Sequence, residues 1–262
     1  MKITLFTSNN TRHNYLINLL SRVCKELYVV QECNTIFPGL VPDHYPASKV
    51  MQKYFDKVYA AQKKLFGNPY INCTANKIKL LPVLAGEINN CSLKFLKDFL
   101  KSEIYIVYGS SYIKGDLVNF LVKKRAINIH MGVSPYYRGT DCNFWALYQN
   151  NPHLVGATIH YLTKGLDNGP MLYHAVSNIK KNPFEYTMST VKAAFHSLAD
   201  RIKDKSILKL KPLNQERSKE INYSKKIEFN NAIVSKYFKK QINLKSKKID
   251  ISLLKDPYFL KH

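Results

Sequence analysis

The sequence predicts an α/β protein in which helices flank a mostly parallel sheet and a small appendage follows at the C-terminus. Short apolar runs that suit buried strands alternate with segments whose apolar residues recur at helical spacing, and this alternation is typical of parallel sheets covered by helices. The 262 residues are 45% hydrophobic, which is enough for a core that needs no disulfide bond. We expect a main domain at 1–202 and a small C-terminal segment at 203–262.

The chain opens with the pattern of a βαβ unit. Residues 2–7 form an apolar run that predicts a buried strand, and the SNNT after them favours a turn and a helix cap. Apolar residues at helical spacing predict a helix over 12–26, and 27–31 predict the second strand. After the first strand the chain reads SNNTRH in place of the G-x-G-x-x-G that binds dinucleotides, so a nicotinamide cofactor is disfavoured.

The same alternation continues through the middle of the chain. In an open α/β sheet, ligands bind outside the carboxyl ends of the strands. The segment from 33 to 76 is weakly patterned and predicts a loop followed by one helix. We predict strands at 77–83, 103–109, 125–130, 155–163 and 170–179, and helices at 50–66, 92–102, 114–124 and 184–203.

The formal net charge of +22 raises the question of nucleic-acid binding, because clustered Lys and Arg neutralise phosphates and release counterions. Of the 40 basic residues, 34 are Lys and 6 are Arg, and Asn and Ile are also abundant. An AT-rich coding bias produces this excess without selection for binding. The positive field still favours anionic substrates, but a dedicated nucleic-acid role is the weaker interpretation.

Cysteine usage and hydropathy favour a reduced, cytoplasmic protein. The five Cys are odd in number and form no C-x-x-C pair, so neither a disulfide framework nor a zinc ribbon is indicated. The N-terminus lacks the segments of a signal peptide, and no apolar run approaches the roughly eighteen residues of a membrane span.

One stretch carries candidate chemistry: NIHMGVSPYYRG at 128–139. Strand alternation places Asn128 and His130 on one face of the predicted strand, so both side chains emerge at its carboxyl end. Gly and Pro then force an irregular loop, and loops on a rigid scaffold are where sites are built. A lone His at a strand end is most simply a structural residue. Its pairing with Asn128 and with a downstream acid favours a functional site.

The downstream acid is Asp167, which lies in the turn KGLDNGP after the predicted strand 155–163. An Asp before N-G-P also suits ordinary turn chemistry, and taken alone Asp167 would be assigned that role. His160 and His174 have no metal-ligand spacing to His130, so we interpret both as structural and expect no metal.

The combination N-I-H-x-G-x-x-P-x-x-R-G with a later L-D-x-G-P resembles the folate-dependent formyltransferases. The resemblance runs from the first strand to about Ser177 and is closest to the bacterial N-formyltransferases that act on nucleotide-linked (dTDP) amino sugars. It implies an enzyme with a Rossmann-like fold that uses 10-formyltetrahydrofolate as donor. It also implies that Asn128, His130 and Asp167 are the catalytic residues.

Each of these three groups has a chemical role in formyl transfer to an amine. The Asn128 amide is expected to donate to the oxygen that becomes negative when the amine attacks the formyl carbon. His130 is the candidate for proton transfer, or for stabilising that oxygen when protonated. Asp167 is expected to orient the imidazole and hold its charge, and to accept the amine proton through water.

The resemblance also implies two binding regions. The segment after the predicted strand 103–109 is expected to wrap the pterin of the donor with backbone groups. For the acceptor, Arg138 offers bidentate phosphate contacts that Lys cannot make, and a loop-pinning role for this Arg is an equal alternative. The donor residues would be Ser111, Tyr112, Ile113, Thr163 and Lys164, and the acceptor residues would be Tyr137, Arg138 and Asp141.

Departures from the relatives favour an amino sugar as acceptor. Methionyl-tRNA formyltransferases usually carry S-L-L-P after the His and a β-barrel domain, whereas this chain has M-G-V-S-P and a remainder too short for such a barrel. We therefore expect formylation of a nucleotide-activated deoxy amino sugar, foremost dTDP-4-amino-4,6-dideoxyglucose, for O-antigen (lipopolysaccharide) synthesis. A methionyl-tRNA formyltransferase-like enzyme and a non-catalytic basic nucleic-acid-binding protein are the alternatives. We expect a homodimer through 203–262 and no membrane or nucleic-acid partner.

Overall fold

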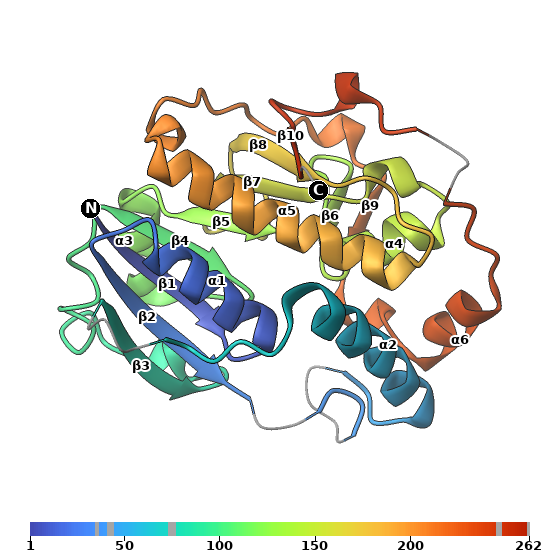
Figure 1. Ribbon diagram of the computed structural model, residues 1–262, viewed down its shortest axis with the longest axis horizontal. Helices are drawn as coiled ribbons and strands as arrows, with labels where there is room; N and C mark the ends of the chain where they lie inside the picture. Colours follow the sequence, from blue (N-terminus) through green and yellow to red (C-terminus); the bar gives the residue numbers. More distant parts are fainter. Residues whose placement is uncertain (35–36, 41–44, 73–76, 245–247, 261–262) are drawn as a thin grey trace.

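The computed structural model describes the whole chain except residues 35–36, 41–44, 73–76, 245–247 and 261–262. The strands of its main sheet are β1 (Lys2–Ser8), β2 (Glu26–Cys33), β3 (Ile78–Leu84), β4 (Ile104–Tyr108), β5 (Ile127–His130), β7 (Ala157–Tyr161), β8 (Met171–Val176) and β10 (Tyr258–Phe259). Over the described residues this sheet has eight strands in the order β10-β8-β7-β5-β4-β1-β2-β3 (Figure 1). β7 is antiparallel to both of its neighbours, and all other neighbouring strands are parallel.

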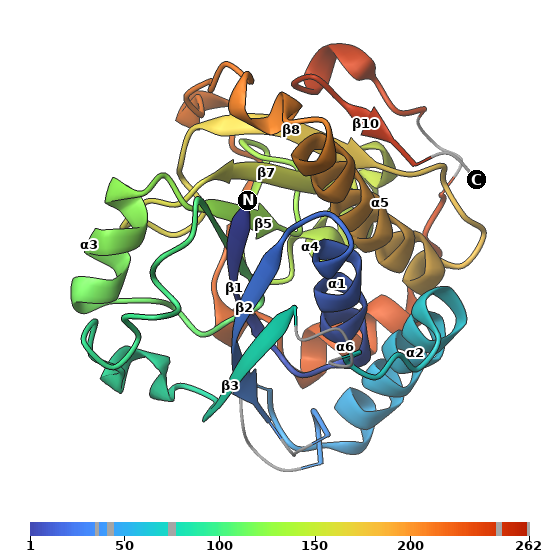
Figure 2. The ribbon, with the colours of Figure 1, turned by 60° about the vertical axis from the view of Figure 1, so that its left-hand side comes forward.

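Helices cover both faces of this sheet (Figure 2). They are α1 (Thr11–Ser21), α2 (Lys49–Phe66), α3 (Gly115–Lys123), α4 (Cys142–Tyr148), α5 (Pro183–Lys203) and α6 (Asn231–Lys239). α1 and α5 share one apolar cluster with β1, β4 and β5, whereas α3 packs in a second cluster on the other face. α2 packs against α5 and α1 from outside. The result is a sheet sandwiched between helices, with its strand ends left for a site.

The central strands are buried on both faces, which explains their uninterrupted apolar sequences. All residues of β4 and β8 are buried, whereas the edge strand β3 exposes most of its side chains. A strand between two helical layers has no water-facing side, so it shows a continuous apolar run instead of alternation. The α/β class, the mostly parallel sheet and the opening βαβ unit are confirmed.

One predicted helix is wrong. Residues 93–100 form turns, with i→i−4 bonds from the amides of Leu96 and Leu100 to the carbonyls of Ser92 and Leu96 but no continuous series of such bonds. The Thr4 and Tyr105 hydroxyls donate to the carbonyl oxygens of Phe99 and Leu100, which fixes the end of this segment to the sheet. The apolar spacing of this segment therefore anchors turns against the sheet.

The segment after Lys203 contributes two strands that pair with the rest of the protein. β10 adds a strand beside β8 at the edge of the main sheet. β9 (Asn222–Ser224) pairs in parallel with β6 (Tyr137–Gly139), a short strand in the region that the sequence predicted as a loop. The appendage is thus continuous with the sheet, and dimerisation through it stays a prediction.

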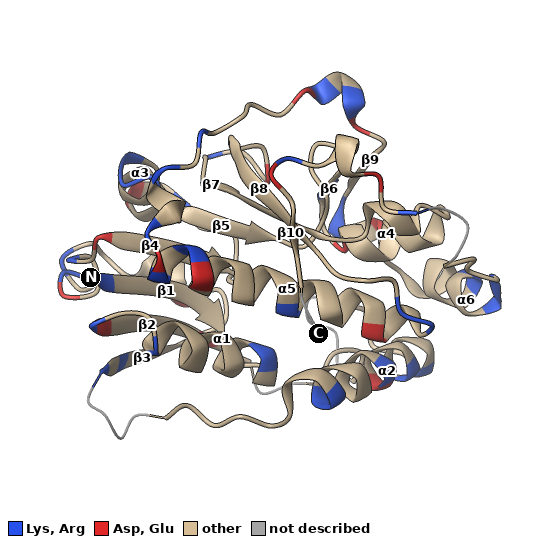
Figure 3. Ribbon diagram, turned by 45° about the horizontal axis from the view of Figure 1, so that its top comes forward, with Lys and Arg blue, Asp and Glu red and all other residues tan. Residues whose placement is uncertain are grey.

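The positive charge is spread over the molecule. Figure 3 shows Lys and Arg on α2, α3, α5 and α6 and on the connecting loops. Such a spread agrees with a compositional origin of the charge. None of the described helices is long and apolar enough to cross a membrane.

Candidate active site

The site lies at the carboxyl end of β5, near the middle of the sheet. Asn128 is paired with Val107 of β4 on one side and with His160 of β7 on the other. His130, two residues later, points to the same face as Asn128, as strand alternation predicts. β5 is fixed between two neighbours, so both polar side chains start from a rigid backbone.

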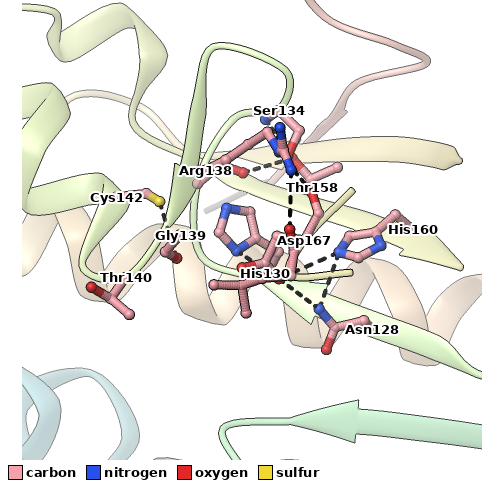
Figure 4. A network of polar contacts seen from close by, with 12 residues as sticks. Asn128, His130, Ser134, Arg138, Gly139, Thr140, Cys142, Thr158, His160 and Asp167 are labelled. Carbon is pink, nitrogen blue, oxygen red and sulfur yellow. Dashed lines mark hydrogen bonds and ion pairs between the residues drawn. The ribbon is translucent and has the colours of Figure 1, made fainter. Parts of the chain in front are cut away.

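Asp167 reaches this strand end from the turn between β7 and β8 (Figure 4). Its Oδ1 lies 3.1 Å from Asn128 Nδ2, 3.3 Å from His130 Nδ1 and 3.7 Å from His160 Nε2. Its φ of 47° is left-handed, a conformation that Asp tolerates better than most residues. Among the described residues, Asp167 Oδ2 has no hydrogen-bond partner. This carboxylate is therefore held by one oxygen and free at the other.

The protons of Asn128 and His160 follow from their partners. His160 Nδ1 lies 2.8 Å from the Tyr161 carbonyl oxygen, so Nδ1 carries the proton and Nε2 accepts. Asn128 Nδ2 lies 3.0 Å from that Nε2, so its two hydrogens go to His160 and to Asp167. In this state the Asn128 amide has no hydrogen to spare for an oxyanion. The oxyanion role stays a prediction that requires one of these two bonds to be exchanged.

His130 lies between two acceptors. Besides Asp167, the Tyr137 carbonyl oxygen lies 3.2 Å from His130 Nε2, and only an imidazole protonated on both nitrogens donates to both. Burial lowers the pKa of His130, but the Asp167 carboxylate and, after it, the Cys142 thiol together outweigh burial and hold this pKa well above its usual value. Burial raises the pKa of Asp167, and the charge of His130 outweighs this and holds it well below its usual range. The two residues form a buried ion pair.

Replacing His130 by Asn is expected to reduce the free energy of unfolding more at pH 5.5 than at pH 9.5. A raised His pKa contributes stability that is complete below the unfolded value of about 6.5 and disappears as the pH rises through the folded value. The lowered pKa of Asp167 contributes stability above about pH 4. The ion pair therefore stabilises fully between about pH 4 and 6.5. Urea unfolding of both proteins at the two pH values measures this difference.

His174→Asn is the matched control, because burial lowers the pKa of His174 to about 4. A lowered His pKa gives the opposite pH dependence of stability. The stability that it contributes is complete above about pH 6.5 and is lost as the pH falls. The effect of His174→Asn should therefore be larger at pH 9.5 than at pH 5.5. Equal effects of His130→Asn at both pH values would contradict an ion pair with Asp167.

Gly132 allows the loop after His130 to close over the imidazole. A Cβ at Gly132 would lie 2.6 Å from both His130 Nε2 and the Cys142 Cβ, and 3.1 Å from the Tyr137 carbonyl oxygen. Real Cβ atoms do not approach other atoms this closely. The glycine of the M-G-V-S-P loop is thus needed for the close packing of His130 against the start of α4.

Two side chains hold the turn that carries Asp167. Arg138 Nε donates to the Asp167 carbonyl oxygen at 3.3 Å, and its Nη1 forms an ion pair with Glu220 at 2.7 Å. Gln215 Nε2 donates to the carbonyl oxygens of Asp167 at 3.0 Å and of Gly169 at 2.8 Å. Arg138 thus holds the turn that carries Asp167, which is the loop-pinning role that the sequence left as an alternative for this residue. Glu220 and Gln215 come from the C-terminal segment.

The side chains of the other two candidate acceptor residues, Tyr137 and Asp141, lie apart from the network. The Tyr137 ring is fully buried, and its hydroxyl bonds to Gln149 and Asn151, so this side chain belongs to the core and is not available to a substrate. Asp141 is partly buried with a left-handed φ of 54°. Burial raises the pKa of Asp141 to about 6, and a hydrogen bond from the Tyr45 hydroxyl at 3.2 Å opposes that shift.

The two candidate donor segments face each other across the strand end. Tyr112 follows β4 and its hydroxyl donates to the Lys164 carbonyl oxygen in the turn after β7. The Ser111 amide donates to Glu32, and the Tyr112 carbonyl accepts from Asn89. The Ser111 amide and the Tyr112 carbonyl are therefore already paired within the protein, and the half-exposed Tyr112 side chain joins the two segments. Binding of a pterin by the backbone of these segments stays a prediction.

Two candidates make little contact with such a ring through their side chains. Ile113 is buried in the apolar cluster around α3, so only its backbone is available to a ligand. The Thr163 hydroxyl donates to Asn168 within its own turn. Among the described residues, no group of three or more His, Cys, Asp or Glu could hold a metal ion. Cys24, Cys33, Cys91 and Cys142 are free thiols, and Cys73 lies outside the described residues.

The sequence interpretation missed His160, Gln215 and Glu220. His160 was assigned a structural role, yet it accepts a hydrogen bond from Asn128. This contact depends on the antiparallel pairing of β7 with β5, which puts His160 opposite Asn128 and which the sequence alone does not give. Gln215 and Glu220 carried no local signal, because Gln215 bonds to Asp167, 48 positions away, and Glu220 pairs with Arg138, 82 positions away.

His160→Ala is expected to lower kcat about 10²-fold with little change in KM, because a catalytic group displaced by about 1 Å loses this much. Without His160 Nε2, one hydrogen of the Asn128 amide loses its partner and the amide can rotate. His160→Gln, which restores an acceptor, should recover part of the rate. Steady-state kinetics of both variants, with thermal unfolding as the control for folding, measure this. A rise in KM at constant kcat would contradict the positioning role.

Part of the chain is similar to known formyltransferases. Residues 99–204 match the family model described as formyl transferase. A curated methionyl-tRNA formyltransferase from Desulforamulus reducens is 29% identical over 104 residues, which are 40% of this chain and 32% of that protein. The chain therefore spans about a third of the length of this curated relative.

Solved structures share the fold at low sequence identity. A 4-N formyltransferase from Francisella tularensis has a TM-score of 0.50 at 20% identity, over 85% of this chain and 75% of that chain. An N-formyltransferase from Helicobacter canadensis, solved with folinic acid and dTDP-3-aminofucose, has a TM-score of 0.52 at 18% identity, over 88% and 72%. The chain thus has the fold of these solved N-formyltransferases. The part of it that matches the formyl transferase family model, residues 99–204, carries Asn128, His130 and Asp167.

Proposed function

We propose that this protein transfers a formyl group from 10-formyltetrahydrofolate to the amine of a nucleotide-linked deoxy amino sugar. The observation that carries the proposal is the Asp167 carboxylate, whose Oδ1 contacts Asn128 and His130 while Oδ2 has no partner among the described residues. A carboxylate held in this way is positioned to accept a hydrogen bond from an attacking amine and, because His130 keeps its pKa low, to pass the proton on and not retain it. The formyl transferase match supplies the reaction class.

The site residues divide the chemistry among them. When bound, the donor supplies the formyl group. Asp167 Oδ2 accepts, directly or through one water, the proton that the amine loses as its nitrogen bonds to the formyl carbon. The His130 imidazolium keeps a positive charge beside the oxygen on which negative charge develops. The Asn128 amide donates to that oxygen after exchanging one of its internal bonds. As the bond from the formyl carbon to N10 breaks, Asp167 passes the proton taken from the amine to N10, directly or through water, so protons and charge balance.

In this proposal the donor pterin lies between the backbone of residues 111–113 and that of Thr163 and Lys164. Both segments follow strands that flank β5, so a ring between them would present its formyl group to Asn128 and Asp167. Entry of the ring would require the hydrogen bond between Tyr112 and Lys164 to open. Arg138 would act on the acceptor mainly through the turn that it pins.

The acceptor is the finer part of the proposal. One solved structure of the same fold is described as a sugar N-formyltransferase, and another is an N-formyltransferase in complex with dTDP-3-aminofucose. The M-G-V-S-P loop after His130 also departs from the tRNA-modifying relatives. We infer a nucleotide-linked amino sugar, with dTDP-4-amino-4,6-dideoxyglucose as the first substrate to test and O-antigen synthesis as the role.

One assay tests the function. The purified protein is incubated with 10-formyltetrahydrofolate and either the 3-amino or the 4-amino isomer of the dTDP-linked sugar, and the products are analysed by mass spectrometry. We expect one isomer to gain the mass of one formyl group. Absence of a formylated product with all isomers and with both dTDP and UDP carriers would refute the sugar proposal.

A methionyl-tRNA acceptor is the second candidate, favoured by the 29% identity to the curated relative. The same assay, run with aminoacylated initiator tRNA, separates the two. Glycinamide ribonucleotide serves as a third acceptor. Formylation of the tRNA alone would establish this second candidate in place of the first.

A further inference from the structure

A pocket of about 300 Å³ lies on the outer side of the turn that carries Asp167. Leu166 and Asn168, the neighbours of Asp167, line one wall, together with Arg138. The opposite wall is the C-terminal segment, which contributes Arg217, Glu220 and Tyr223. The pocket thus shares a turn with the catalytic carboxylate, although nothing in the proposed chemistry uses it.

The C-terminal segment that forms one wall of this pocket is bonded to the rest of the site both before and after Arg217 in the sequence. Before it, Gln215 donates to the Asp167 carbonyl, and Leu213 pairs with Met171. After it, Glu220 forms the ion pair with Arg138, and β9 continues the β6 strand pairing. A ligand in the pocket would therefore lie at a defined distance from Asp167.

The pocket carries a net positive charge. Arg138 is 7% exposed and its charge is balanced by Glu220 at 2.7 Å. Arg217 is exposed and, among the described residues, has no acidic side chain within ion-pair distance. Both cations are Arg although the chain has 34 Lys and only 6 Arg. A planar guanidinium binds two oxygens of one phosphate at once, which an ammonium cannot do.

An aromatic ring borders the same pocket. The Arg138 guanidinium lies 5.5 Å from the centre of the Tyr223 ring, and Tyr223 is 42% exposed. A half-exposed aromatic beside a cationic pocket offers a flat surface for a base or sugar next to its phosphates. The chemistry of the pocket therefore suits a nucleoside diphosphate better than an isolated carboxylate.

The geometry points to this pocket as the diphosphate subsite of the acceptor, with Arg217 as its free cation and Tyr223 at its edge. This inference rests on the proposed function, because it takes the acceptor to be nucleotide-linked. The other anionic substrate group is the glutamate tail of the donor. The candidate donor residues Ser111, Tyr112, Thr163 and Lys164 do not line the pocket, which favours the acceptor.

The test is direct binding by calorimetry, independent of turnover. Arg217→Ala should weaken the binding of thymidine diphosphate at least tenfold and leave the binding of tetrahydrofolate within twofold of wild type. Arg217→Lys should recover only part of the loss, because the bidentate contact is absent. Arg22→Ala, which removes an exposed charge from the end of α1, is the control and should leave both affinities unchanged.

Two results would overturn the inference. Weaker tetrahydrofolate binding with unchanged thymidine diphosphate binding would assign the pocket to the donor tail. Unchanged thymidine diphosphate affinity in Arg217→Ala, or no binding of thymidine diphosphate by wild type, would refute the subsite. If wild type still formylates an amino sugar in that case, the proposed function stands. Conversely, Arg217-dependent binding in a protein that formylates no amino sugar would support the subsite and refute the proposed function.

Discussion

Replacing Asp167 by Asn is expected to lower kcat/KM for formyl transfer by about 10²- to 10⁴-fold, the range that general acid-base catalysis supplies. Asn keeps the size of Asp, so the contacts of the turn to Arg138 and Gln215, which use the backbone carbonyl of residue 167, remain. What is lost is the proton acceptor at Oδ2 and the negative charge beside His130. Steady-state kinetics with the formyl donor and the amino sugar nucleotide measure the effect.

A second measurement separates this chemical loss from a structural one. The carboxylate is the group that raises the pKa of His130, so an NMR titration of Asp167→Asn should show this pKa falling. Asp56→Asn, an exposed carboxylate on α2, is the matched control and should change neither quantity. Asp167→Asn with turnover within tenfold of wild type would show that this carboxylate is not the proton acceptor.

The part of the site that lies on one strand could be predicted from the sequence. The alternation of polar and apolar residues in 125–130 places Asn128 and His130 on one face, because the backbone of a strand fixes which face each side chain takes. Asp167 was assigned to the site only through the resemblance to the formyltransferases, because an Asp before N-G-P is explained more simply as a turn residue. Its contacts to Asn128 and His130 depend on how β7 turns back beside β5.

Contacts that join distant segments could not be predicted. Tyr137 and Arg138 are adjacent in the loop. The Tyr137 ring is nevertheless buried in the core, whereas the Arg138 side chain donates a hydrogen bond to the turn that carries Asp167. Which of them faces the site depends on the pairing of β6 with β9, more than eighty residues apart. The same pairing makes the C-terminal segment part of the wall beside the site, where composition alone suggested a separate appendage.

Gly139→Ala is expected to destabilise the protein by about 3 kcal/mol or more, well beyond the roughly 1 kcal/mol of left-handed strain alone. Gly139 has a φ of 91°, and a Cβ there would lie 2.0 Å from the backbone oxygen of Ser224. That oxygen belongs to β9, so relief of the collision requires β6 and β9 to separate. Separation of these two strands would release the C-terminal segment from the loop that follows His130. Thermal and urea unfolding measure the loss.

Gly86→Ala is the matched control for Gly139→Ala. Gly86 has the same φ of 91°, but a Cβ there would meet no atom within 4 Å, so only the strain of about 1 kcal/mol applies. The difference between the two variants therefore measures the contact between β6 and β9. Equal losses in both variants would mean that Ser224 moves aside freely, and the C-terminal segment would then not be held by this pairing. If the pairing does hold it, the surviving folded fraction of Gly139→Ala should also bind thymidine diphosphate more weakly, because Arg217 and Tyr223 lie on the released segment.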